Sequence, residues 1–144
     1  SYWNLTGATG MDGHTLMIEA DRFLPVDDEC VPTGDIADVA GTPFDFRTPK
    51  PLHLGTAPYD NTYCVATDQQ ALTRAMVLSG GGIELTVLTT ETGAHIYDDG
   101  PAHRGLAIEC QSRPDAPNNP HFPSIEIGPD APVVRTTQWQ FRRT

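Results

Sequence analysis

Glycine and proline recur along the whole chain and constrain its fold more than any other feature. The 144 residues include 13 Gly and 13 Pro. Proline fixes φ and removes a backbone donor, so it is excluded from helix interiors, and both residues mark turns. The stretch from residue 21 to 55 alone carries Pro25, Pro32, Pro43, Pro49 and Pro51. This punctuation predicts short strands joined by turns and no regular helix.

The segments between these turns are strand candidates, and residues 14–20 and 133–141 have the apolar and polar alternation of half-buried strands. The predicted strands cover residues 14–20, 62–68, 71–78, 83–91, 94–99, 105–111 and 133–141. The glycines of "SGGG" (79–82) separate two of them, which predicts a hairpin. Tyr2, Trp3 and Leu5 are typical of the interior of a buried strand. The predicted class is therefore all-β, a large antiparallel β-sandwich.

The composition limits the partners and the setting of such a chain. Apolar residues make up 38%, which is low for a self-contained globule, so further core is expected on another chain or segment. The net charge of -10 repels phosphate backbones and excludes nucleic acid as an expected partner. We also expect no membrane association, because no apolar run is long enough to span a bilayer and the first residues lack a signal peptide's pattern.

The cysteines indicate a reducing compartment. The chain has three cysteines, which are widely spaced and include no CxxC pair: Cys30, Cys64 and Cys110. This pattern argues against a disulfide framework or a zinc knuckle and favours a cytoplasmic location. The histidines have no HxH or HxxxH spacing and none lies at zinc-ligand spacing from a cysteine, so no metal site is expected; they are His14, His53, His95, His103 and His121.

Four residues are candidates for chemistry or binding. Glu109 lies in the apolar run "LAIEC", where it is either an exposed strand residue or a carboxylate tuned in a pocket; the pattern alone favours exposure. Asp60 precedes Asn61, and such Asp-Asn pairs are common in turns. Asp60 is therefore either a turn residue or a carboxylate aimed at a polar ligand. His95 and Tyr97 share one side of their strand, either lining a cleft or forming a polar face.

The segments taken together resemble one family. "SYWNLTG", "ADRFLPVD", "PTGDI", "GTPFDFR", "PYDNTY" and "IECQSRPDAPNN" follow one another in the order seen in aldose 1-epimerases, also called galactose mutarotases. The resemblance implies the galactose-mutarotase-like supersandwich, and residues 1–144 match only the C-terminal portion of that single domain. The N-terminal portion is absent from this chain and is expected as a separate polypeptide, which makes the assembly a heterodimer.

The resemblance also implies an activity and its residues. Members of this family interconvert the α and β anomers of a hexose by acid/base ring opening, with no cofactor. Glu109 matches the catalytic base, and Asp60 matches an aspartate that binds sugar hydroxyls. His95 and Tyr97 are expected to bind the substrate. The acid is a histidine that, in the family, directly precedes the segment like "SYWNL", so it belongs to the N-terminal portion.

Several positions depart from the family pattern and leave alternatives open. The family usually has histidine where Asn61 stands, commonly glutamine at His95, and often an aromatic residue at Arg113. The segment after Tyr97 is shortened and carries "DDG". One alternative is a carbohydrate-binding or non-epimerising member. Another applies the same acid and base to a different cyclic substrate, and a third is a purely structural subunit.

Overall fold

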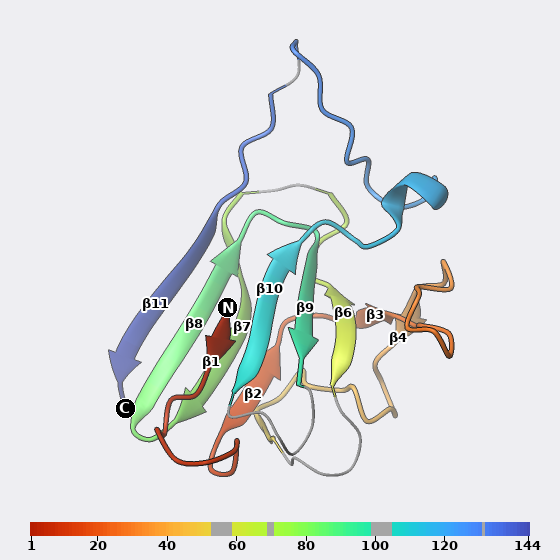
Figure 1. Ribbon diagram of the computed structural model, residues 1–144. Coiled ribbons are helices and arrows are strands. Elements are labelled where there is room, and N and C mark those ends of the chain that lie inside the picture. Colours follow the sequence, from red (N-terminus) through yellow and green to blue (C-terminus); the bar gives the residue numbers. More distant parts are fainter. Residues whose placement is uncertain (53–58, 69–70, 99–104, 131) are drawn as a thin grey trace.

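Two antiparallel sheets make up the computed structural model, which describes residues 1–52, 59–68, 71–98, 105–130 and 132–144 (Figure 1). The six-stranded sheet has the order β1 (Tyr2–Trp3), β10 (Leu106–Gln111), β9 (Gly93–Tyr97), β6 (Asp60–Cys64), β3 (Arg22–Leu24) and β4 (Ala37–Asp38). The five-stranded sheet has the order β11 (Thr137–Arg143), β8 (Ile83–Thr89), β7 (Thr73–Gly80), β2 (Thr15–Ile18) and β5 (Lys50–Pro51). The predicted all-β class is confirmed.

The core lies between the two sheets, because alternate residues of each strand point inward. The six-stranded sheet contributes Tyr63, Ala94, Ile96 and Ile108, each at most 1% exposed. The five-stranded sheet meets them with Leu16, Ile18, Met76, Leu78, Leu85 and Val87, also at most 1% exposed. The opposite face of β6, β9 and β10 is therefore free to carry polar side chains.

The predicted hairpin is present between β7 and β8, which pair from Gly80 with Ile83 to Thr73 with Thr89. Gly81 and Gly82 form its turn with φ values of 58° and 73°. Positive φ at both central residues suits the right-handed twist of the flanking strands, and glycine adopts it without strain. A Cβ on Gly81 would lie 2.6 Å from the Leu5 carbonyl oxygen, so the turn also packs against the chain after β1.

Within the described part of the proline-rich stretch, residues 21–52, the regular elements are the short strands β3, β4 and β5. This agrees with the prediction of no regular helix there. A 3₁₀ turn, η2 (Ala116–Asn118), lies in the loop after β10. The predicted strand 133–141 is displaced: β11 begins at Thr137 and continues to Arg143. Its partner decides these bounds, since β8 ends at Thr89 opposite Thr137 and begins at Ile83 opposite Arg143.

The expectation of a buried first strand is wrong for Tyr2, which is 57% exposed. β1 has two residues and, among the described strands, pairs with β10 alone, so it lies at the edge of the described sheet. Trp3 and Leu5 do pack against the core. The Trp3 ring also contacts the rings of Trp139 (centroids 5.0 Å apart) and Phe141 (5.4 Å), which joins the edges of the two sheets.

Two observations bear on the expected reducing compartment and the expected lack of membrane association. The three cysteines are free, with Cys30 exposed and the other two half-buried. In the part of the chain that the structure describes, no helix has the length and apolar character needed to cross a membrane. His53 and His103, and most of the shortened segment after Tyr97, lie outside the described residues.

Candidate active site

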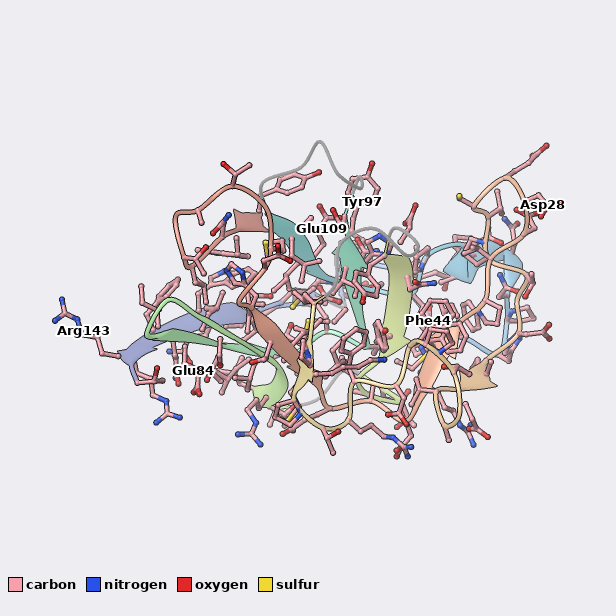
Figure 2. All side chains as sticks on the ribbon, turned by 90° about the horizontal axis from the view of Figure 1, so that it is seen from below. Asp28, Phe44, Glu84, Tyr97, Glu109 and Arg143 are labelled. Atoms are coloured by element: carbon pink, nitrogen blue, oxygen red, sulfur yellow. The ribbon has the colours of Figure 1, made fainter. Side chains whose placement is uncertain are left out.

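Strands β6, β9 and β10 place a row of polar side chains on the sheet face that points away from the core. In this row Thr62 pairs with His95, and His95 pairs with Glu109. The next row joins Asp60 to Tyr97 and Tyr97 to Ala107. Partners on adjacent antiparallel strands have Cβ atoms about 4.5–5.5 Å apart. Figure 2 shows the labelled side chains of Glu109 and Tyr97 on the same side of the molecule.

A cleft of about 220 Å³ opens over the first row. This volume is below the roughly 300–1,000 Å³ of pockets for drug-sized ligands and suits a smaller molecule. Three of the four residues predicted from the sequence line it, and half-buried Tyr97 lies one row away. The lining residues are Leu24, Val26, Cys30, Pro32, Asp60, Thr62, His95, Glu109, Gln111 and Pro114.

His95 is held from two sides within this cleft. Its Nε2 lies 3.1 Å from the Oδ1 of Asp60, and its Nδ1 lies 2.9 Å from the Oγ1 of Thr62. The histidine side chain is 19% exposed and that of Asp60 40% exposed. Both ring nitrogens are therefore engaged by protein atoms, while the Asp60 carboxylate stays partly open to the cleft.

Glu109 is exposed, as the sequence pattern favours, even though its strand neighbours Ala107 and Ile108 are buried. The register explains the difference: Ile108 points into the core with Ile96, and Glu109 points to the opposite face with His95. A carboxylate on this face can accept a proton from a bound molecule without breaking any core contact.

Sequence reasoning missed several lining residues. Thr62 and Gln111 could have been found by alternation, because each lies two positions from a predicted site residue. Cys30 and Pro32 could not, since they come from an irregular loop that has no strand alternation to show which side chains face the cleft. That loop is held by the carboxylate of Asp27, whose Oδ1 accepts the N–H groups of Glu29 (2.9 Å) and Val31 (3.0 Å).

Two departures from the family pattern have structural explanations. Arg113 is 7% exposed, donates from Nη2 to the Ala66 carbonyl at 2.9 Å and lies over the Phe122 ring at 5.6 Å. Its guanidinium plane therefore occupies a buried place that an aromatic ring also suits. Asn61 is 7% exposed and alternates with Asp60 and Thr62, so it faces away from the cleft.

Two larger hollows lie elsewhere on the surface. One of about 730 Å³ lies beside Arg22, Cys64 and Arg113, and one of about 300 Å³ lies beside Glu91 and Arg135. Neither brings together any of the four predicted site residues. Among the residues that the structure describes, no group of three His, Cys, Asp or Glu side chains is arranged to hold a metal ion.

Comparison with known proteins identifies the family. The aldose 1-epimerase family model matches residues 1–139. The chain belongs to the aldose 1-epimerase family. The galactose mutarotase of Bos taurus is 38% identical over 98% of this chain and 48% of its own length. The aldose 1-epimerase of Escherichia coli is 28% identical over 97% of the chain and 48% of its own length.

Solved structures of this family agree with the fold. A GalM/aldose epimerase homologue from C. elegans superposes with a TM-score of 0.80 at 30% identity and covers 99% of this chain and 49% of its own. A galactose 1-epimerase from Lactobacillus acidophilus gives a TM-score of 0.71 at 23% identity, over 99% of this chain and 47% of its own. The chain thus spans about half the length of the relatives it matches.

Proposed function

We propose that this chain is the C-terminal portion of an aldose 1-epimerase domain that interconverts the α and β anomers of a hexose. Glu109 is the base, and Asp60, His95 and Tyr97 bind the sugar. One observation carries the proposal: Asp60, His95 and Glu109 come from three adjacent strands yet line a single cleft. Their convergence on one face is what a site for a small polyol requires.

The proposed reaction moves only protons. Glu109 takes the proton of the C1 hydroxyl while an acid protonates the ring oxygen, and the C1–O5 bond breaks to give the open aldehyde. Rotation about C1–C2 presents the other face of the aldehyde. Ring closure then returns the proton from Glu109 to the new C1 hydroxyl and the other proton to the acid. A positioned acid or base contributes about 10²–10⁴-fold to such a step.

The acid of this proposal is a histidine of the N-terminal portion. The pairing of β1 with β10 sets Tyr2 opposite Ala107 and Trp3 opposite Leu106. The Ile108 N–H also donates to the Ser1 carbonyl at 3.0 Å, which extends the same register. A residue directly before "SYWNL" would then lie opposite Glu109, on the same sheet face. The histidine that the family resemblance puts there would thus stand beside the base.

The N-terminal portion of the proposal is a separate chain that completes both sheets. The exposed edges support it: β1 and β11 each pair with one described strand, and Tyr2 and Phe141 are 57% and 53% exposed. Open edges and exposed aromatic rings are features that proteins normally cover. Intact mass and a denaturing gel of the purified protein test this. A second polypeptide that contains the histidine is expected; a single folded species of 144 residues contradicts it.

Polarimetry on freshly dissolved α-D-glucose and α-D-galactose tests the activity. The protein, with any chain that copurifies, should equilibrate the anomers faster than buffer, and Glu109→Gln should remove about 10²–10⁴-fold of that rate. Glu126→Gln, an exposed carboxylate outside the cleft, is the control and should retain the rate. Equal rates for Glu109→Gln and the control would refute Glu109 as the base.

A second candidate function is sugar binding without epimerisation, or the same chemistry on a different cyclic substrate. The departures from the family pattern beside Asp60 favour it, because His95 stands where the family commonly has glutamine and its ring contacts Asp60. Isothermal titration with D-galactose separates the two functions. Binding without acceleration of mutarotation supports this candidate, and acceleration that depends on Glu109 excludes it.

A further inference from the structure

We infer that Thr62 is a positioning residue that acts through His95 to fix the Asp60 carboxylate. This inference rests on the proposed function, since Asp60 is its sugar-binding group. The three side chains form a chain of contacts across β6 and β9, from the Thr62 hydroxyl to the His95 ring and from the ring to Asp60.

The hydrogen-bonding capacity of each group fixes the direction of this relay. An ionised carboxylate only accepts, so the Nε2 of His95 must carry the proton that it shares with Asp60 Oδ1 at 3.1 Å. In the neutral ring, Nδ1 is then the acceptor, and the Thr62 hydroxyl donates to it at 2.9 Å. The Asp60 carboxylate therefore sets the tautomer of His95, and the Thr62 hydroxyl, by donating to Nδ1, fixes the orientation of the ring that donates to Asp60.

The second carboxylate oxygen of Asp60, Oδ2, is the atom that this arrangement presents to the substrate. His95 engages Oδ1 and sets the plane of the carboxylate, so Oδ2 is aimed in a fixed direction from a side chain that is 40% exposed. A hydroxyl of the substrate can donate to Oδ2 without first ordering the carboxylate. Such preorganisation improves binding because the ordering cost is met in the free protein.

Because Thr62 is buried, its hydroxyl serves the contact with His95 and not contact with solvent. Thr62 is 4% exposed and lines the cleft, and its methyl group lies close to Gly93 of β9, 3.3 Å from the position that a Cβ there would take. Valine keeps this methyl contact and the shape of the side chain while it removes the hydroxyl. Serine keeps the hydroxyl and removes the methyl group.

The test compares Thr62→Val and Thr62→Ser in wild-type protein and in a His95→Gln background. Thr62→Val should raise KM for D-galactose about five- to twentyfold with little change in kcat, because it weakens ground-state and transition-state binding alike. Thr62→Ser should restore most of the loss. In the His95→Gln background Thr62→Val should add no further loss, because the ring that carries the effect is gone. An equal loss in both backgrounds overturns the inference.

A spectroscopic readout tests the relay without activity. ¹⁵N shifts of the His95 ring should show the Nε2–H tautomer at neutral pH in the purified protein. Thr62→Val should keep this tautomer but shift the Nδ1 resonance toward that of an imidazole nitrogen without a hydrogen bond, because its donor is gone. A ring that is already Nδ1–H, or that does not respond to Thr62→Val, overturns the inference. If the tautomer behaves as expected but D-galactose neither binds nor mutarotates, the proposed function fails and the relay stands.

Discussion

Glu109 lies directly opposite His95 in the ladder between β9 and β10, and both side chains leave the sheet on the face away from the core. This pairing puts the proposed base beside a ring that already contacts the proposed sugar-binding carboxylate. The site is thus built on hydrogen-bonded strands, which hold side chains more firmly than loops do. Substitutions on this face should change function while leaving the fold intact.

Replacing the Asp60 carboxylate should weaken substrate binding. In Asp60→Asn the side chain keeps its size but loses its charge, and a hydrogen bond to a charged group contributes about 1.5–3 kcal/mol. We expect KM for D-galactose to rise roughly tenfold or more, measured by coupled assay or polarimetry, with an unchanged Tm. Asp28→Asn, at the exposed tip of a neighbouring loop, is the matched control and should leave KM unchanged (Figure 2).

The two glycines of the β7–β8 turn should differ in their tolerance of alanine. Both have positive φ, which costs a non-glycine residue about 1–2 kcal/mol. In Gly81→Ala the new Cβ also meets the Leu5 carbonyl at 2.6 Å, whereas at Gly82 it meets nothing within 4 Å. Urea unfolding should therefore show a clearly larger loss for Gly81→Ala. Equal losses would mean that the Leu5 segment is not packed on the turn.

The core between the sheets should be sensitive to lost volume. Leu78 is 0% exposed and belongs to the cluster formed by both sheets. Leu78→Ala should lower the free energy of unfolding by about 2–5 kcal/mol, because it removes apolar contacts and leaves a cavity. Ile127→Ala, at a residue 74% exposed, is the control and should change it by less than about 0.5 kcal/mol. Denaturant titration measures both.

Alkaline pH should destabilise the protein. Burial raises the pKa of the Cys64 and Cys110 thiols above their usual range, and it raises the pKa of Tyr63 as well. A raised pKa in the folded state means that the stabilisation is complete below the pKa of the unfolded thiol, about 8.5, and is lost as pH rises above it. Tm should fall between pH 8 and 10.

A cysteine variant supplies the control for this pH dependence. The double variant Cys64→Ala and Cys110→Ala should have a lower Tm at neutral pH but a shallower decline between pH 8 and 10. A decline as steep as that of the wild type would show that other groups, such as Tyr63, cause it. Cys30→Ala, which changes an exposed thiol, should leave the decline as it is.

Local pattern was sufficient to predict the longer strands, with shifted bounds for β6 and β11, and the hairpin, but not the short strands β3, β4 and β5. Alternation in residues 83–91 reflects one buried and one open face. In residues 105–111 the single Glu109 in an apolar run favoured an exposed position, which the structure shows. The resemblance to the family then supplied Asp60 as a partner for Glu109. Their shared cleft depends on how β6, β9 and β10 pair, which no single segment encodes.

The features that escaped prediction depend on long-range contacts. The bounds of β11 follow from the length of β8. The exposure of Tyr2 follows from the place of β1 at a sheet edge. The contact of His95 with Thr62 and Asp60 needs two strands in one register, so the sequence placed His95 on a polar face without showing what its ring binds.

The chain has two tryptophans, and Trp3 and Trp139 lie against each other where the edges of the two sheets meet. All of its indole emission therefore originates from one place. A chain that completes both sheets would cover this place, and separation of the sheet edges would expose it to water. Tryptophan fluorescence is thus a built-in reporter of assembly along these edges, and titration of any second polypeptide can be followed without an added label.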